Sequence, residues 1–319
     1  MIWTKRLSWL LVAWISAQAV AQMVVPGNEE DYSVERRDGI EFGMNIGVYR
    51  GAPAPAGIYD GYGKDGYQGV DLPDGAAQLW TIKRRLEQLA QFQQTNPIVG
   101  ILNESPGWDV YSFPLMQYRP ALSFGLKMAK FWNPETALVV SLDAIQLTAE
   151  GAWSLEQVGV LPDQGQGNVA TEDFGIEGKE NRLNVSLGYR TSVYMQEGLS
   201  WIMEFGGLAT AYSLEENYLL MASAPGQLQP YRLDLLTMVN NGAGPLNRAS
   251  GLLTQWGTGA YVGAGVDVAF QEGGRIELNL RVSRDNVKLG LQENKVWNGA
   301  LFITWMIPSQ IGDFVRASF

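Results

Sequence analysis

Apolar and polar residues alternate one by one along many stretches of this chain. In one clear case, Leu183, Val185 and Leu187 are separated by the polar residues Asn184 and Ser186. A period of two places successive side chains on opposite faces of a β-strand, so each stretch predicts a strand with one apolar and one polar face. Eight such stretches occur, near residues 40–48, 121–128, 138–149, 182–193, 201–210, 262–270, 276–283 and 301–307.

Two of these stretches are irregular. In the third, the apolar face passes from even-numbered positions, ending at Leu142, to odd-numbered positions, beginning at Ile145. This change of phase predicts a β-bulge. In the last stretch the two faces are less distinct, because Phe302 and Met306 lie on the side expected to be polar.

The segments that connect the predicted strands alternate in length. Tight hairpin turns are expected at residues 133–135, 197–198 and 272–274. Longer connections lie near residues 52–117, 157–180 and 223–252, with a shorter one near 291–295. Short periplasmic turns and longer external loops are typical of bacterial outer-membrane barrels. We therefore predict an all-β fold, a single eight-stranded, antiparallel, up-and-down transmembrane β-barrel in the outer membrane.

Aromatic residues gather near both ends of the predicted strands. One group lies beside the short turns and comprises Phe131, Trp132, Tyr194, Trp201 and Phe270. A second group lies near the opposite rim and comprises Tyr49, Tyr118, Trp153, Tyr212 and Trp256. Rings of aromatic side chains mark the two membrane–water interfaces of outer-membrane barrels, so both groups are expected to form girdles.

The N-terminal residues predict export. Lys5 and Arg6 precede a short apolar run over residues 7–15, and Ala17, Ala19 and Ala21 follow at alternate positions. This pattern is that of a secretory signal peptide cleaved after about Ala21. The expected organisation is a signal peptide over 1–21, a periplasmic N-terminal segment over 22–38, the barrel over 39–307 and a C-terminal tail over 308–319.

Composition narrows the range of functions. The chain has 46% apolar but only 18% charged residues, and its net charge of -10 argues against binding nucleic acid. It has no Cys and no His, which removes the thiol nucleophile and the commonest general base and zinc ligand. No catalytic residue, cofactor or metal site is nominated, and we expect that the protein is not an enzyme. A soluble barrel of lipocalin type would point its apolar face inward and carry more charge than this chain.

The glycine-punctuated strands resemble those of a known superfamily. The resemblance is carried by residues 42–47 (Phe-Gly-Met-Asn-Ile-Gly) and 118–125 (Tyr-Arg-Pro-Ala-Leu-Ser-Phe-Gly). These segments look like the small outer-membrane barrels of OmpA-like, OmpX-like and PorT-like type, and most like uncharacterised barrels of the Bacteroidota type. Such families often end in a Phe, as this chain does at Phe319, but Pro308 and Asp313 interrupt the expected final strand. Either the last strand ends near Ile307 or the eighth strand lies elsewhere.

The polar faces of the predicted strands carry charges of both signs. These residues are Glu41, Lys127, Asp143, Arg182, Arg190, Glu204, Asp267, Glu277 and Arg281. Side chains fill the interior of an eight-stranded barrel, and charges withdrawn from water must pair. We therefore predict an ion-pair network in the lumen; the alternative is a small-solute channel lined by the same residues.

The first long external segment is predicted to contain a helix over residues 76–94. Its apolar face includes Leu79, Ile82, Leu86 and Leu89, and its other side carries Lys83, Arg84 and Arg85. The helix would pack on the barrel mouth or act as a lid or docking element, with its cations near lipid A phosphates. The acidic residues Asp60, Asp65 and Asp71 before it match no EF-hand spacing, which favours a surface loop over a calcium site.

The function expected from these patterns is structural or interactive. The external loops would carry any partner recognition, and the alternative is a small-solute channel or a ligand-binding transport barrel. The expected partners are outer-membrane lipid and lipopolysaccharide, the barrel-assembly machinery, and an extracellular or outer-membrane protein.

Overall fold

The computed structural model describes residues 39–60, 108–112, 115–157, 171–196, 198–221, 231–234, 254–270, 274–289 and 292–307. The predicted signal peptide, the N-terminal segment over 22–38, the loop helix over 76–94 and the tail over 308–319 lie outside these ranges.

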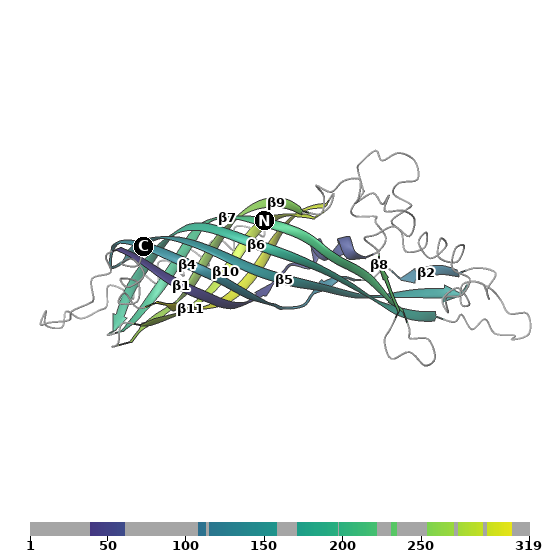
Figure 1. Ribbon diagram of the computed structural model, residues 1–319, viewed down its shortest axis with the longest axis horizontal. Helices are drawn as coiled ribbons and strands as arrows, with labels where there is room; N and C mark the ends of the chain where they lie inside the picture. Colours follow the sequence, from purple (N-terminus) through teal and green to yellow (C-terminus); the bar gives the residue numbers. More distant parts are fainter. Residues whose placement is uncertain are drawn as a thin grey trace, which may run out of the picture.

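Eight strands close into a ring (Figure 1). They are β1 (Gly39–Arg50), β4 (Ala121–Asn133), β5 (Thr136–Gln157), β6 (Thr171–Gln196), β7 (Leu199–Met221), β9 (Thr254–Ala269), β10 (Arg275–Leu289) and β11 (Gln292–Met306). Each pairs antiparallel with the next, and β1 pairs with β11, so that Ile46 lies between Phe124 and Ile303. The prediction of an eight-stranded antiparallel barrel is confirmed.

The burial pattern is the reverse of that in a water-soluble protein. Outward-facing apolar side chains are exposed, with Phe42 at 49% and Leu280 at 57%, while the inward-facing Asp143, Arg190 and Glu277 are fully buried. An apolar exterior around a polar interior is stable only where lipid surrounds the barrel. Among the described residues, no helix has the length and apolar character needed to cross a membrane.

The bulge predicted in the third strand is absent. β5 pairs with β6 from Thr136 to Glu156 without a shift of register, and inward and outward positions alternate from residue 136 to 150. Ile145 and Leu147 point into the lumen, in continuation of Asp143. The change of sequence phase therefore marks the depth at which the lumen lining turns from polar to apolar.

The eighth strand ends where it was predicted but begins about nine residues earlier, at Gln292, so residues 292–295, expected to be a connection, pair with β10 as part of β11. β11 ends at Met306, and the two side chains that blurred its pattern, Phe302 and Met306, are buried inside the barrel.

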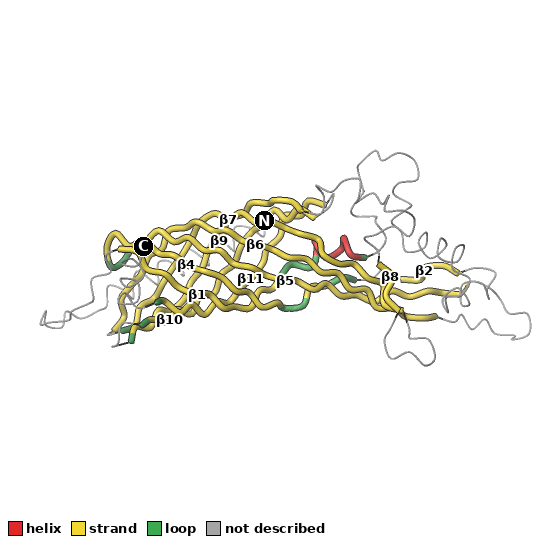
Figure 2. The backbone as a smooth tube through the Cα atoms, viewed as in Figure 1, coloured by secondary structure: helices red, strands yellow, loops and turns green. Residues whose placement is uncertain are grey.

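Three strands extend well beyond the membrane. β5, β6 and β7 have 22, 26 and 23 residues, whereas a transmembrane strand needs about 9–11. Residues 171–180, expected to be part of a connection, thus belong to β6. The short strands β2 (Trp108–Ser112) and β8 (Tyr231–Asp234) pair with the outer ends of β5 and β7, giving a projecting sheet in the order β2-β5-β6-β7-β8 (Figure 2).

The aromatic girdles are only partly as predicted. Beside the short turns, Trp132, Tyr194, Trp201 and Phe270 face outward, but Phe131 is buried in the lumen. At the other rim Trp256 faces outward, and the side chain of Trp153 lies outside the described part of the structure.

Three tyrosines expected at that outer rim point inward. Tyr49, Tyr118 and Tyr212 are each at most 8% exposed. The alternation itself places Tyr49 on the inward face, next to the outward-facing Val48, so strand phase determines its position more strongly than its aromatic character.

Candidate functional site

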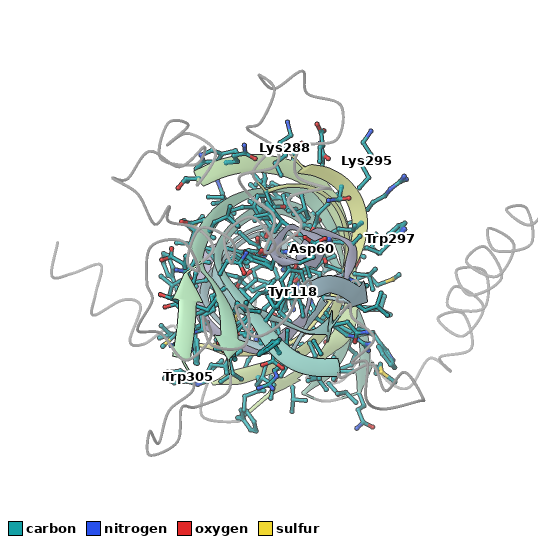
Figure 3. All side chains as sticks on the ribbon, turned by 90° about the vertical axis from the view of Figure 1, so that its right-hand side faces the viewer. Asp60, Tyr118, Lys288, Lys295, Trp297 and Trp305 are labelled. Carbon is teal, nitrogen blue, oxygen red and sulfur yellow. The ribbon has the colours of Figure 1, made fainter. Side chains whose placement is uncertain are left out.

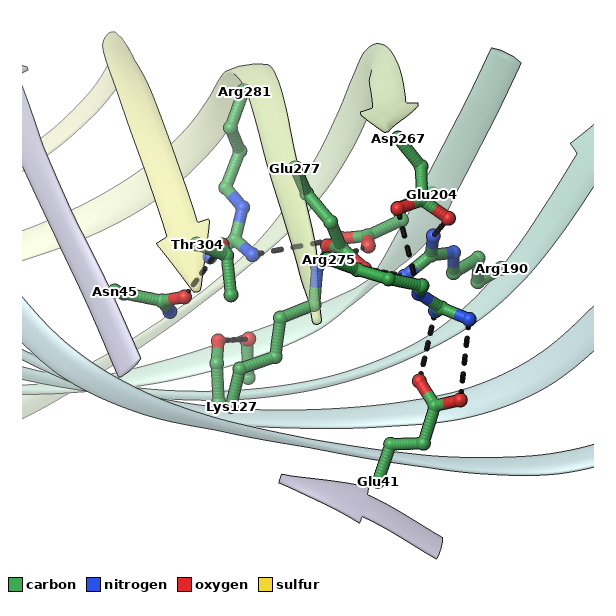
Figure 4. Close-up of polar contacts among 12 residues, drawn as sticks. Glu41, Asn45, Lys127, Arg190, Glu204, Asp267, Arg275, Glu277, Arg281 and Thr304 are labelled. Atoms are coloured by element: carbon green, nitrogen blue, oxygen red, sulfur yellow. Dashed lines mark hydrogen bonds and ion pairs between the residues drawn. The ribbon is translucent and has the colours of Figure 1, made fainter. Parts of the chain in front are cut away.

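The lower lumen, near the short turns, contains a group of buried ion pairs (Figure 4). Lys127 on β4 lies at its centre, with its Nζ 2.5 Å from Glu204 Oε1 on β7 and 2.8 Å from Glu277 Oε2 on β10. Arg190 on β6 pairs with Glu277 and, at 3.5 Å, with Asp267 on β9. Strands from opposite walls of the barrel are therefore joined through the lumen.

Further contacts extend this group of ion pairs toward the short turns and toward the outer mouth of the barrel. Arg275, at the start of β10, donates to both carboxylate oxygens of Glu41 at 3.2 and 2.8 Å, and its Nε lies 3.6 Å from Asp267 Oδ1. At the other end, Arg281 lies 3.5 Å from Asp143 and 3.7 Å from Glu204.

These ion pairs form one continuous network. It links Glu41, Arg275, Asp267, Arg190, Glu277, Lys127, Glu204, Arg281 and Asp143, in that order. Eight of the nine charged residues predicted to meet in the lumen belong to it; the ninth, Arg182, lies elsewhere. The network also contains Arg275, which lies two residues before Glu277 on the same face and would have been found by extending the alternation by one step.

Arg182 forms the centre of a second cluster near the outer mouth. Its Nε donates to Glu180 Oε1 at 2.6 Å and one terminal nitrogen donates to the Tyr49 hydroxyl at 3.1 Å. Its guanidinium also lies over the rings of Tyr49, Tyr118 and Tyr212, 5.2–5.8 Å from their centroids. Cation–π contacts of this kind stabilise a buried guanidinium. We call these residues, together with Tyr59, the mouth cluster.

A short 3-10 helix, η1 (Ala54–Tyr59), folds into the mouth directly after β1. It contacts β6 on one wall and β10 and β11 on the other, so it crosses the opening. The Tyr59 hydroxyl donates to Glu180 Oε2 at 2.9 Å, and the Tyr118 hydroxyl donates to the same oxygen at 2.7 Å. Burial, followed by the nearby Glu180 charge, raises the pKa of Tyr59 well above its ordinary value, so the phenol remains a donor.

The segment that leads into η1 is fixed as well. The backbone N–H of Ala52 donates to Asn298 Oδ1 at 2.8 Å, and Asn298 donates to Asp285 Oδ2 at 2.5 Å. We call residues 51–60 the plug, because hydrogen bonds from opposite walls hold its two ends. Asp60 is 91% buried at the end of the plug, while Asp65 and Asp71 lie outside the described residues.

A small cavity separates the network from the mouth cluster. Its volume is about 20 Å³, and its lining includes Tyr49, Ser186, Arg281, Ser283 and Phe302. Such a volume holds about one water molecule. Within the described residues no group of three acidic side chains is placed to hold a metal ion.

The closed ring, the apolar exterior and the filled polar interior define a transmembrane β-barrel of the bacterial outer-membrane class. The protein is accordingly an outer-membrane barrel.

Comparison with known proteins shows distant likeness only. No protein-family model matches the chain, and no curated protein matches its sequence. Among solved structures, Neisserial surface protein A is similar over 85% of this chain and 97% of its own, with a TM-score of 0.41 and 6% identity. Ail of Yersinia pestis, solved with the heparin analogue sucrose octasulfate, has a TM-score of 0.32 and 10% identity over 84% and 97% of the two chains. OprG of Pseudomonas aeruginosa has a TM-score of 0.30 and 11% identity over 85% and 94%.

Proposed function

We propose that this protein is a non-conducting, non-enzymatic barrel that acts in the outer membrane as a structural or interaction protein. Its lumen serves to hold the barrel wall together, and its projecting sheet carries partner recognition.

The observation that carries this proposal is that the lumen is crossed at two depths. The ion-pair network joins opposite walls in the lower half, and the mouth cluster with the plug closes the upper half. A solute would have to separate buried ion pairs, and each broken pair leaves an uncompensated charge costing several kcal/mol. The cavity between the two layers has a volume of about 20 Å³, which holds about one water molecule.

The projecting sheet is suited to recognition through its faces. Its long strands β5 and β7 would each present a free edge, but β2 and β8 pair with these edges. Covered edges disfavour strand addition by another chain. A partner would therefore contact the polar outward face, where Lys179 pairs with Glu216 at 2.8 Å, or the segments that connect the strands.

Planar-bilayer recordings test the closed lumen. The folded wild-type protein is expected to give no stable openings. A positive control is a variant in which Lys127, Arg190, Glu204 and Glu277 are replaced by Ser and Gly178 by Val, which empties the lower lumen and displaces the plug. Large, stable wild-type openings would favour the channel alternative.

A shortened variant tests the recognition role. Glu150 pairs with Glu177 in register, so residues 151–176 can be replaced by an Asn-Gly turn that closes a shorter hairpin. The barrel should still fold, as shown by its altered gel mobility without heating, but capture of outer-membrane or extracellular partners by cross-linking should be lost. A second variant lacking residues 76–95 tests the predicted loop helix in the same assay.

A further inference from the structure

The outer face of the barrel changes from apolar to basic on one wall. On β10, the outward positions Leu280 and Val282 are followed by Arg284 and Lys288. On β11, the corresponding change runs from Leu301 to Trp297 and Lys295, and on β1 from Val48 to Arg50.

These cations form a stripe along three neighbouring strands of the sheet. Arg284 is paired in register with Trp297, Lys288 with Glu293, and Arg50 with Gly299, which lies two residues from Trp297. Arg50, Arg284, Lys295 and Lys288 therefore follow one another in steps of two residues along the strands, and the first and last lie about 20 Å apart. We call Arg50, Arg284, Lys288 and Lys295 the basic rim. Figure 3 shows Lys288, Lys295 and Trp297 pointing away from the barrel on the same side.

The basic rim contrasts with the opposite wall. There, Arg119 pairs with Glu150 at 2.5 Å, Lys179 with Glu216 at 2.8 Å, and Arg232 with Glu177 at 3.6 Å. Within the described part of the chain, no cation of the basic rim forms a salt bridge. The nearby carboxylate Glu293 accepts a hydrogen bond from Asn286 at 2.5 Å. Glu293 is the register partner of Lys288 and offsets part of this charge, but four cations against this carboxylate leave the basic rim net positive on a protein whose net charge is -10.

The neighbouring side chains show at which level of the membrane the basic rim lies. Trp297 is 61% exposed, and the Arg284 guanidinium lies 5.8 Å from the centroid of its ring. Exposed Trp residues mark the level of lipid headgroups, and the next outward apolar side chains toward the short turns are Val282 on β10 and, past Gly299, Leu301 on β11. A ligand that spans this boundary has acyl chains against the apolar side chains and anionic groups against the cations.

We propose that the basic rim is a binding site for the phosphate groups of an acidic glycolipid of the outer leaflet, of the lipid A type. Arg and Lys form charge-assisted hydrogen bonds with phosphate, and cations next to a membrane surface attract anionic headgroups. The proposal goes beyond the interaction role of the projecting sheet. It requires that the long-strand end of the barrel faces the outer leaflet, the orientation predicted from the lengths of the connections.

The test compares two variants of the folded barrel in detergent. In the first, Arg50, Arg284, Lys288 and Lys295 are all changed to Gln. In the matched control, the paired cations Arg119, Lys179 and Arg232 are changed to Gln. Native mass spectrometry measures binding of diphosphorylated lipid A and of phosphate-free lipid A with the same acyl chains, with inorganic phosphate as a competitor.

The basic-rim variant is expected to bind diphosphorylated lipid A at least about tenfold more weakly than wild type, given the contribution of each cation near an anionic surface. Binding of phosphate-free lipid A should not change, and the control should stay within about twofold of wild type. If the fourfold variant does not fold, the double variants R50Q/R284Q and K288Q/K295Q should each weaken binding severalfold.

Three results would overturn the proposal. They are wild-type affinity in the basic-rim variants, an equal loss in the control, and equal affinity of wild type for both forms of lipid A. Equal affinity for both forms of lipid A, together with binding of inorganic phosphate that is lost in the basic-rim variant, would show that a free anion, rather than a glycolipid, is the ligand.

Discussion

At the scale of single residues, the lumen shows how charge is accommodated inside a narrow barrel. Arg190 is fully buried and has two carboxylate partners, Glu277 and Asp267, on two other strands. Removing one member of a buried ion pair leaves the rest uncompensated, which is far more costly than losing an exposed pair.

We expect that Arg190→Met lowers the free energy of unfolding by about 3 kcal/mol or more, because two buried carboxylates each lose one of their cationic partners. The measurement is urea unfolding of the protein refolded into lipid vesicles, followed by Trp fluorescence. Arg119→Met is the control. The Arg119 side chain is 70% exposed, so the loss of its ion pair with Glu150 should lower the free energy of unfolding by less than about 1 kcal/mol. Adding Glu277→Gln to Arg190→Met should restore part of the loss; equal costs for the two single variants would refute the role of the network.

Most members of the network could be predicted from the sequence, because alternation assigns each charged residue to a face. Two things could not be predicted. Alternation does not show how far along the lumen a residue lies. It therefore places Arg182 with the charges of the lower lumen, although Arg182 lies in the mouth cluster with Glu180. Aromatic character was also misleading, since Tyr118 and Tyr212 stack on Arg182 inside the mouth rather than at a lipid interface.

At the scale of elements, the plug is the feature that strand patterns do not reveal. Residues 54–59 have neither a helical nor an alternating pattern, and the contacts that hold them come from strands distant in the sequence, as in the hydrogen bond of Tyr59 with Glu180, 121 positions away. The closest approach is at Gly178 on β6, where any Cβ atom would clash with the ring of Tyr59. Glycine is therefore required at this position for the plug to enter.

We expect that Gly178→Val displaces the plug while the barrel remains closed around it. The chain has no native cysteine, so Ala56→Cys provides a single reporter at a position that is fully buried. Its reaction with a water-soluble maleimide should be slow in the otherwise unchanged protein and at least about tenfold faster with Gly178→Val. Gly175→Val is the control, because a Cβ there has only ordinary contacts with Leu220. A rate that does not differ between these two variants would show that Tyr59 does not hold the plug in place.

At the scale of the whole molecule, the architecture follows from one requirement. In lipid, every backbone N–H and C=O must be paired within the protein, which a closed ring of strands achieves. The strand count and the direction of the faces could therefore be predicted from periodicity and connection length. The outer extent of β5, β6 and β7 could not, because beyond the membrane their outward residues become polar, as at Lys179 and Asn181, and resemble a loop sequence.

The orientation of these faces gives the last prediction. Leu278 and Asn279 are adjacent on β10, yet Leu278 is 42% exposed on the outside and Asn279 is 2% exposed inside the lumen. A bimane fluorophore attached to Cys in Leu278→Cys should be strongly quenched by lipids with brominated acyl chains, because it lies among them. The same fluorophore in Asn279→Cys should be quenched far less, provided that gel mobility shows the barrel to be folded. Stronger quenching at position 279 would mean that the polar face meets the lipid, and the lumen network, the closed mouth and the basic rim would all have been assigned to the wrong side of the wall.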